Sequence, residues 1–340
     1  MIYTILAGNT VILKPSEKSQ KLPMLIEQLL NESRLTELGA GILIPGGPET
    51  GEYLIQHPSV QKIIFFGHQK TGDKIAHACI KHCKPFILES GGGSTSFVLK
   101  DADLKLAASG LAWSAFYANG QSCVSTERIF IDRAIEEEFL LLFKKETRAI
   151  WNDRRQNPSR IEFADSDQNR YKDFINTAES EGADIYYIEG KDETQSFTHF
   201  CPTIISKISS KNRLLKEEIF GPLVTIVPID DIPRTALYVN KAFSTLGVSI
   251  WSRNTKTAMS LAKKIHVGMI WINDSSFGLP NLPWGCWEKS GWGTLFSEHS
   301  LHEVTRMKWV SRHPALWAKP RIWWNPYKKK IFLISARYFF

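Results

Sequence analysis

Apolar and polar positions alternate along the first ninety residues in two periods, one typical of strands and one typical of helices. Short runs rich in apolar and β-branched residues predict strands at 10–13, 42–44, 62–66 and 85–88. Helical spacing of apolar residues predicts helices at 22–30, 52–56 and 71–82. Strands that alternate with helices indicate parallel βαβ units, in which ligands bind at the carboxyl ends of the strands. We therefore expect the chemistry in the turns that follow these strands.

A second α/β region follows after about residue 93. Asp101 or Asp103 is placed to cap a helix that ends near Tyr117 and has one broad apolar face. Further strands are predicted at 128–131, 223–227 and 247–251. The polar stretch 152–170 contains an Asn-Pro pair and predicts a surface loop. The pattern as a whole predicts an α/β fold.

Composition limits the classes of partner. With 340 residues, 43% of them hydrophobic, the chain can bury a large core in about two domains. The net charge of +7 comes largely from Lys and Arg near the end, and no nucleic-acid motif accompanies it, so we expect no nucleic-acid partner. Trp323, Trp324 and Tyr327 lie among lysines in this tail. Packing against the body or another subunit is the favoured reading of the tail, with weak membrane contact as the alternative.

The spacing of the five cysteines does not predict a disulfide framework. Only Cys79 and Cys83 are close in sequence, and no second Cys or His pair completes a metal site. We expect reduced thiols, no metal and a cytoplasmic location. The first seven residues lack the basic region and cleavage site of a signal peptide, and no apolar run approaches the roughly 20 residues of a membrane span.

Cys123 and Glu89 stand in unusual contexts. A single cysteine is usually a packing residue, but Cys123 ends the loop 119–123 after a helix, where a turn can expose a thiol. Glu89 ends a predicted strand and is followed by glycines. A glutamate there would more often be a surface residue or a helix cap.

Together these segments resemble the paired signature of the aldehyde dehydrogenase superfamily, Glu-x-Gly-Gly followed by Gly-Gln-x-Cys. The separation, 123 − 89 = 34 residues, is similar to the usual spacing in the family. Three more segments are similar to family motifs in the same order, at 7–17, 217–222 and 283–293. The resemblance covers about residues 5 to 310.

The resemblance implies a domain plan for the chain. It implies an aldehyde dehydrogenase-like fold, with a partial Rossmann-type NAD-binding domain at 1–92 and an α/β catalytic domain at 93–295. A return segment and the basic aromatic tail would occupy 296–340. It also implies a homodimer.

The resemblance further implies NAD-dependent oxidation of a small-molecule aldehyde to a carboxylate. The Cys123 thiolate would form a thiohemiacetal and then a thioester, and Glu89 would activate the hydrolytic water as general base. The Cys123 backbone N–H would supply one oxyanion donor.

The same resemblance assigns the cofactor residues. Lys14 and Glu17 would hold the adenosine ribose, and a carboxylate there favours NAD over NADP. Glu218 would hold the nicotinamide ribose and Phe220 would pack near the ring. The turn at Gly47 would lie near the pyrophosphate, although an ordinary turn is an equally good reading. The turn at Gly67 and His68 stands beside the nicotinamide in the family's pattern, with His68 bulkier than the usual serine.

The pattern also departs from the family. The usual chain begins upstream of Met1, so we expect that its first strands, a segment used in subunit contacts and an oxyanion-hole asparagine have no counterpart here. Cys286 stands where glycine is usual. A second hypothesis is therefore a truncated, inactive remnant that acts at most as a binding or interaction module. A third is an acylating relative that uses coenzyme A, against which the retained Glu89 argues.

Overall fold

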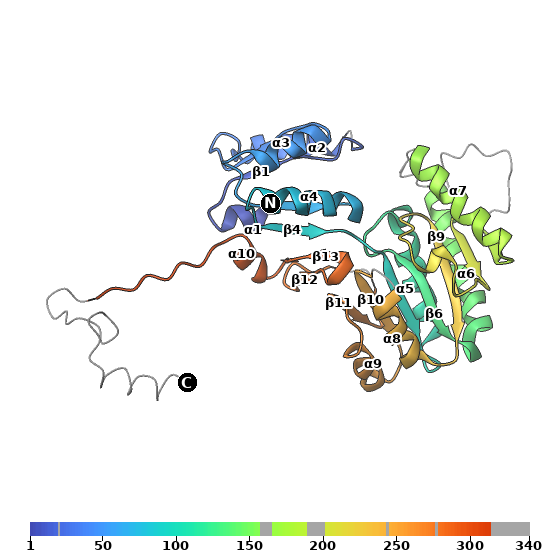
Figure 1. The fold of residues 1–340 in the computed structure, drawn as a ribbon. Helices are drawn as coiled ribbons and strands as arrows, with labels where there is room; N and C mark the ends of the chain where they lie inside the picture. Colours follow the sequence, from blue (N-terminus) through green and yellow to red (C-terminus); the bar gives the residue numbers. More distant parts are fainter. Residues whose placement is uncertain (20, 157–164, 189–200, 243–244, 276–277, 314–340) are drawn as a thin grey trace, which may run out of the picture. The chain divides into compact units, whose positions relative to one another are not determined.

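The computed structural model describes residues 1–19, 21–156, 165–188, 201–242, 245–275 and 278–313 (Figure 1). The chain divides into two compact units, residues 1–304 and 305–340, and the fold described below is that of the first. Trp323, Trp324 and Tyr327 of the predicted tail lie outside the described residues. The predicted boundary after residue 92 remains a prediction.

The N-terminal part consists of short parallel strand pairs with helices between them. Its elements are α1 (Ile2–Leu6), β1 (Val11–Leu13), α2 (Leu22–Glu32), β2 (Gly41–Leu43), α3 (Pro48–Gln56), β3 (Ile63–Phe66), α4 (Gln69–Lys81) and β4 (Phe86–Glu89). Strand β1 pairs in parallel with β2, and β3 pairs in parallel with β4. The alternation predicted from the apolar pattern is confirmed, because every predicted strand and helix has a counterpart within a few residues.

The middle of the chain forms a larger sheet. Its strands are β5 (Ser94–Val98), β6 (Thr126–Asp132), β7 (Asp184–Tyr187), β8 (Thr203–Ser206), β9 (Leu223–Ile229), β10 (Gly247–Trp251) and β11 (Met269–Ile272). Within the described ranges they run in the order β11-β10-β5-β6-β9-β8-β7. All neighbours are parallel except β7 and β8, which are antiparallel. A mainly parallel sheet needs helices on both faces.

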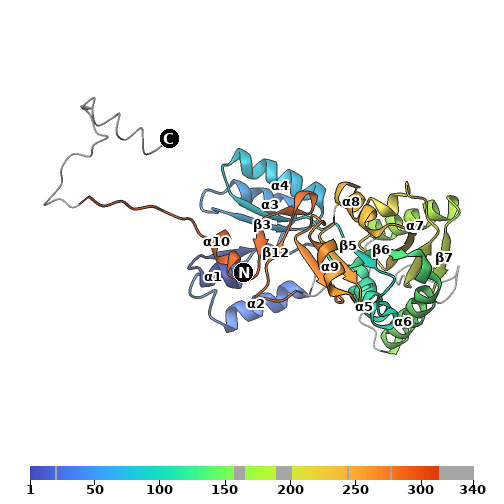
Figure 2. The same ribbon diagram turned by 90° about the horizontal axis from the view of Figure 1, so that it is seen from below.

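Helices cover both faces of this sheet (Figure 2). They are α5 (Leu104–Phe116), η1 (Tyr117–Gly120), η2 (Arg133–Ile135), α6 (Glu136–Gln156), α7 (Asp165–Ser180), η3 (Arg213–Leu215), α8 (Ile232–Ala242) and α9 (Thr255–Ala262). Val98, Ile129 and Ile131 pack against α5 and α6, whereas Phe97 and Phe130 pack against α8 and α9. Side chains alternate between the faces of a strand, so these runs are apolar on both sides.

Two local predictions can now be settled. Asp103 rather than Asp101 caps α5, since its side chain accepts a hydrogen bond from Leu106 N at 3.2 Å. The predicted surface loop over 152–170 is wrong at both ends, because α6 continues to Gln156 and α7 begins at Asp165. Ile150 packs against the core cluster that contains Phe139 and Phe143, so tertiary contacts stabilise α6 up to the edge of the polar segment. Residues 157–164 lie outside the described part.

The late segment returns to the N-terminal part. It contains β12 (Trp284–Gly285), η4 (Glu288–Ser290), β13 (Gly291–Trp292), β14 (Thr294–Leu295) and α10 (His299–Glu303). Strand β13 pairs antiparallel with β4, so that Gly291 lies opposite Glu89. This pairing brings a segment about two hundred positions later in the chain to the strand that carries Glu89.

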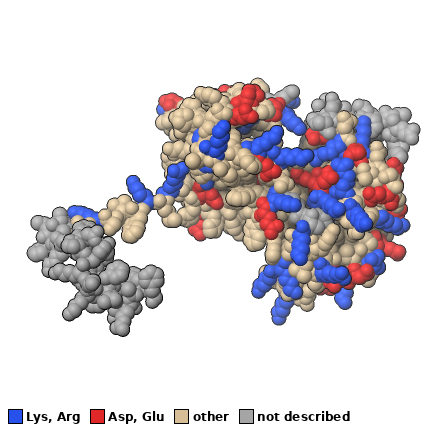
Figure 3. All heavy atoms as spheres, viewed as in Figure 1, with Lys and Arg blue, Asp and Glu red and all other residues tan. Residues whose placement is uncertain are grey.

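On the face seen in Figure 3, Lys and Arg are interspersed with Asp and Glu. None of the helices in the described ranges is both long enough and apolar enough to cross a membrane.

Candidate active site

Cys123 lies at the end of a tightly turned segment between α5 and β6. Ala118, Asn119 and Gly120 all have left-handed backbone angles, with φ of 50°, 57° and 68°. A Cβ added to Gly120 would lie 2.1 Å from the backbone oxygen of Gly221, so only glycine permits this close approach. The Cys123 side chain is half-buried and packs against the cluster of Val124, Leu246, Met269 and Cys286.

Glu89 is the last residue of β4 and is buried, with 4% of its surface exposed. Trp284 Nε1 donates a hydrogen bond to Glu89 Oε2 at 3.0 Å, while Oε1 has no hydrogen-bond partner among the described residues. Burial raises the pKa of Glu89 to about 7, and the Trp284 hydrogen bond opposes this rise. A carboxyl group with this pKa can act as a proton acceptor near neutral pH.

The structure brings Cys123 and Glu89 to one place through Trp284. Trp284 bonds to Glu89, and both Trp284 and Cys123 pack against the Cys286 cluster. Burial, followed by the negative charges of Glu89 and Glu218, raises the pKa of the Cys123 thiol to about 12. The thiol is therefore protonated at neutral pH in this state of the site, and its reaction as a nucleophile requires a base.

Glu218 and Phe220 lie next to the glycines that follow Glu89. Glu218 Oε1 accepts a hydrogen bond from Gly92 N at 2.9 Å, and a Cβ on Gly91 would lie 2.3 Å from the same oxygen. Phe220 is 37% exposed and has a left-handed φ of 49°. The two residues predicted for the nicotinamide end therefore lie close to the Glu89–Cys123 pair.

Gly67 and His68 follow β3 and adjoin the same strand end. Gly67 N donates to the Glu89 backbone oxygen at 2.9 Å, and a Cβ on Gly67 would lie 2.6 Å from the Phe65 ring. His68 is exposed and caps α4, since its Nδ1 accepts a hydrogen bond from Lys70 N at 3.2 Å. The cap gives a local structural reason for a histidine at this position.

Lys14, Glu17 and Gly47 form a second group at the turns after β1 and β2. Lys14 Nζ lies 3.6 Å from Glu17 Oε2 and donates to the Gly46 oxygen at 2.7 Å, which joins the two turns. The Glu17 carboxylate is 57% exposed. Its pKa is lowered, first by a hydrogen bond from its own backbone N–H and also by Lys14, with weak burial opposing. Gly47 is the N-cap of α3, and its N–H donates to Glu49 Oε1 at 3.1 Å.

Three residues near the centre have no counterpart among the residues predicted from the sequence. Trp284 was only part of a motif, and Cys286 only an unusual replacement for glycine. The charges of Glu89 and Cys123 add to burial in raising the pKa of Cys286, which places this thiol beside both. Glu127 carried no sequence signal, because a charged residue four positions after Cys123 would ordinarily be read as exposed.

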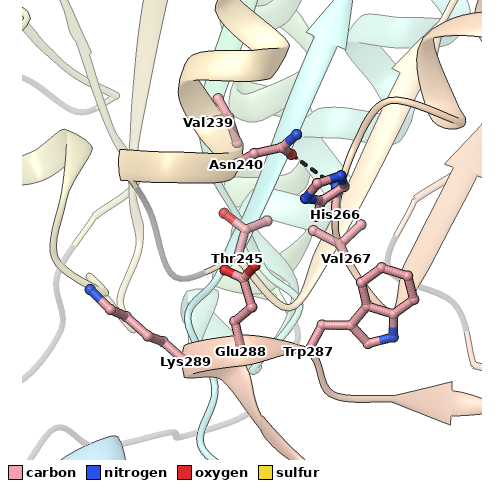
Figure 4. Close-up of a pocket in the computed structure, with 8 residues that line it drawn as sticks. All are labelled: Val239, Asn240, Thr245, His266, Val267, Trp287, Glu288 and Lys289. Carbon is pink, nitrogen blue, oxygen red and sulfur yellow. Dashed lines mark hydrogen bonds between the residues drawn. The ribbon is translucent and has the colours of Figure 1, made fainter.

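A small surface hollow lies outside this centre. It is lined by Val239, Asn240, Thr245, His266, Val267, Trp287, Glu288 and Lys289 (Figure 4). Asn240 Oδ1 accepts a hydrogen bond from His266 N at 2.9 Å within it. The hollow and the site share one segment, since Cys286 is buried in the Cys123 cluster while the next three residues line the hollow. No residue predicted for catalysis or cofactor binding lines it.

Comparison with known proteins shows the family. Residues 1–310 match the model of the aldehyde dehydrogenase family, and the chain belongs to this family. It is 31% identical over 317 residues to 2-aminomuconic semialdehyde dehydrogenase of Mus musculus, and 30% identical over 313 residues to betaine aldehyde dehydrogenase 1 of Rhizobium meliloti. Both matches cover 90% of this chain, but only 65% and 64% of the relatives.

Solved structures show the same fold. The crystal structure of an NAD-dependent aldehyde dehydrogenase from Sinorhizobium meliloti matches with a TM-score of 0.81 at 24% identity, over 93% of this chain and 64% of that one. An indole-3-acetaldehyde dehydrogenase in complex with NAD⁺ matches with a TM-score of 0.80 at 26% identity, over 90% and 63%. The predicted aldehyde dehydrogenase-like α/β fold is confirmed. The chain spans about two thirds, or slightly less, of the length of the relatives it matches.

Proposed function

We propose that this protein oxidises an aldehyde to a carboxylate with NAD, using Cys123 as nucleophile and Glu89 as general base. The observation that carries the proposal is the convergence of the two on Trp284. A buried carboxyl group with a pKa of about 7 adjoins a thiol that needs a base. Membership of the aldehyde dehydrogenase family gives this arrangement its reaction class.

The first step concerns the Cys123 thiol. The Glu89 carboxylate takes the thiol proton, directly or through water, and the sulfur attacks the aldehyde carbon to form a thiohemiacetal. The backbone N–H of Cys123 is a donor for the oxygen that becomes negative. Because the pKa of Cys123 is raised to about 12 in part by carboxylate charge, neutralising Glu89 by this proton also favours the thiolate.

The residues around the centre suit NAD. Glu218 and the partly exposed ring of Phe220 would lie at the nicotinamide end of the cofactor. Lys14 and the exposed Glu17 carboxylate would lie at its adenosine end. An exposed carboxylate at the adenosine ribose accepts hydroxyl hydrogens and repels a 2′-phosphate, which favours NAD over NADP. The turn at Gly47 would adjoin the pyrophosphate. When bound, NAD supplies the hydride acceptor. The NAD⁺ complex of a structural neighbour supports this choice.

Hydrolysis of the resulting Cys123 thioester completes the reaction. Glu89 first releases the thiol proton to solvent, and its carboxylate then takes a proton from water as the water oxygen bonds to the acyl carbon. The carbon–sulfur bond breaks, Glu89 returns the proton to the Cys123 sulfur, and the carboxylic acid loses its own proton to solvent. Glu89 Oε1, which has no hydrogen-bond partner among the described residues, offers an acceptor position for that water. The products are the carboxylate and the regenerated thiol.

The test is NADH formation by the pure protein with NAD and a panel of aldehydes. Because relatives are named for 2-aminomuconic semialdehyde and betaine aldehyde, the panel includes both. Cys123→Ser should abolish turnover, whereas Cys83→Ser, at an exposed cysteine away from the site, should leave it unchanged. A Cys123→Ser variant as active as the parent would overturn the mechanism.

The other outcomes separate the alternatives. Binding of NAD without NADH formation from any aldehyde would support the inactive remnant that acts as a binding module. NADH formation that depends on coenzyme A, with a thioester as product, would support the acylating relative.

A further inference from the structure

Three backbone segments meet behind the proposed site. One is Gly91–Gly93, which follows Glu89. The second is Glu127–Arg128, which begins four residues after Cys123. The third is Glu218–Phe220. Each segment therefore carries or adjoins a residue of the proposed mechanism.

A β-bulge at the start of β6 directs Glu127 towards this junction. Ser94 pairs with Thr126 and Thr95 pairs with Arg128, so Glu127 is an extra residue in the ladder between β5 and β6. Bulges next to active sites commonly re-aim a side chain. The Glu127 and Arg128 side chains are both buried, with 1% and 0% of the residues exposed.

Hydrogen bonds join the three segments in a closed circuit. Glu127 Oε1 accepts from the backbone N–H groups of Ile219 and Phe220, each at 2.9 Å. Glu127 Oε2 accepts from Arg128 Nη2 at 2.9 Å, and the same nitrogen donates to the Gly92 oxygen at 2.9 Å. Gly92 N donates in turn to Glu218 Oε1 at 2.9 Å, which returns the circuit to the segment that Glu127 holds.

The glycines make room for this circuit. A Cβ on Gly93 would lie 2.4 Å from the Glu127 carboxylate, and a Cβ on Gly91 would lie 2.3 Å from that of Glu218. Both glycines have left-handed backbone angles, with φ of 66° at Gly93 and 72° at Gly91. The Glu127 and Glu218 carboxylates thus occupy space that a side chain at Gly93 or Gly91 would need.

We propose that Glu127 is a positioning residue for the nicotinamide end of the cofactor site. It fixes the backbone of Ile219 and Phe220, and thereby the places of the Glu218 carboxylate and the Phe220 ring. The inference rests on the proposed function, which assigns Glu218 and Phe220 to the cofactor. A left-handed φ at Phe220 costs free energy for a non-glycine residue, and the two backbone hydrogen bonds that Glu127 accepts offset that cost.

An ion pair in so buried a place is not explained by stability alone. Burial raises the pKa of Glu127 to about 7, with Arg128 and the two backbone N–H groups opposing the rise. Replacing a buried ion pair by apolar residues is often neutral or stabilising. What Glu127 supplies and an apolar side chain cannot is an acceptor for two backbone donors at a defined point.

The test compares two double variants that leave no unpaired buried charge. Glu127→Gln with Arg128→Met keeps an amide oxygen for the Ile219 and Phe220 N–H groups, whereas Glu127→Ala with Arg128→Met removes it. The dissociation constant and KM for NAD should be at least about tenfold higher in the alanine variant, because displacement of positioning groups by 1 Å can cost about 10²-fold. Thr225→Val, which removes a hydrogen bond to the Glu127 backbone oxygen, is the control for a buried polar loss on the same strands.

A second readout separates positioning from a general loss of structure. Acylation of Cys123 by p-nitrophenyl acetate needs the thiol but no cofactor, and its rate should agree within about twofold between the two double variants. Equal dissociation constants for NAD in the two variants would overturn the inference and leave the proposed function intact. Equal losses of acylation and NAD binding would show a structural role and overturn it as well. A parent protein that does not bind NAD would overturn both proposals.

Discussion

Glu89 illustrates how a single residue acquires its reactivity from opposing effects. Burial favours its neutral form, and the hydrogen bond from Trp284 favours the charged form. The result, a pKa of about 7, suits a base that must both gain and lose a proton in each cycle. Cys123 shows the converse, because burial and nearby carboxylates hold its thiol protonated.

Glu89→Gln should slow both the attack of Cys123 and the release of product. The amide can accept neither the thiol proton nor the water proton, so we expect kcat to fall by about 10²–10⁴-fold, with no rapid first turnover of NADH in rapid-mixing experiments. Glu288→Gln, at an exposed glutamate within 283–293 to which the proposed mechanism gives no role, is the matched control. Unchanged steady-state turnover in Glu89→Gln would contradict its role as general base.

Trp284→Phe should shift the pH dependence of the reaction. Loss of the indole N–H removes the hydrogen bond that lowers the pKa of Glu89, so this pKa rises above its value of about 7. The rising limb of the kcat profile should then move to higher pH, and activity at neutral pH should fall. Trp287→Phe, which changes a half-exposed neighbour, should leave the profile in place. An unshifted profile in Trp284→Phe would show that titration of Glu89 does not determine the rising limb of the kcat profile.

At the scale of elements, the turn from α5 into β6 decides where Cys123, the proposed nucleophile, lies. Asp103 caps the start of α5, and three successive left-handed residues end the segment near Cys123. Gly120 then approaches the backbone of Gly221, one residue after Phe220. The close contact ties the Cys123 loop to the segment predicted to hold the cofactor.

Gly120→Ala should therefore damage both stability and the site. A methyl group would lie 2.1 Å from the Gly221 oxygen, in addition to the cost of a left-handed alanine. Gly182→Ala is the matched comparison, because Gly182 also has a left-handed φ, of 81°, but no atom lies within 4 Å of the added group. We expect about 1 kcal/mol of destabilisation for Gly182→Ala and clearly more for Gly120→Ala in urea unfolding. Equal losses would mean that the close contact relaxes without cost.

At the scale of the whole molecule, buried carboxyl groups link stability to pH. Glu89 has a pKa of about 7 in the fold and an ordinary value of 4.5. Between these values the folded protein binds more protons than the unfolded chain. The stability that the neutral carboxyl contributes is therefore present at low pH and is lost as pH rises through about 7.

This linkage predicts that the difference in the free energy of unfolding between the parent and Glu89→Gln changes with pH. The amide does not titrate, so the free energy of unfolding of the parent relative to the variant should fall from about pH 5 to about pH 8. The full change would be on the order of 3 kcal/mol. Glu127, whose pKa is also raised, is common to both proteins and cancels in the difference. Denaturant unfolding at a series of pH values measures it, and a constant difference would exclude a raised pKa for Glu89.

Local periodicity was enough to predict the order of strands and helices, because the spacing of apolar residues within each element reflects which of its faces is buried. The motifs around Glu89 and Cys123 were enough for the family and for the choice of catalytic candidates. Sequence did not reveal that Trp284 bonds to Glu89, that Cys286 adjoins both, or that Glu127 holds the backbone at Phe220. These contacts depend on the pairing of β13 with β4 and on the bulge in β6. Such features arise from packing between segments far apart in the chain, which no local pattern encodes.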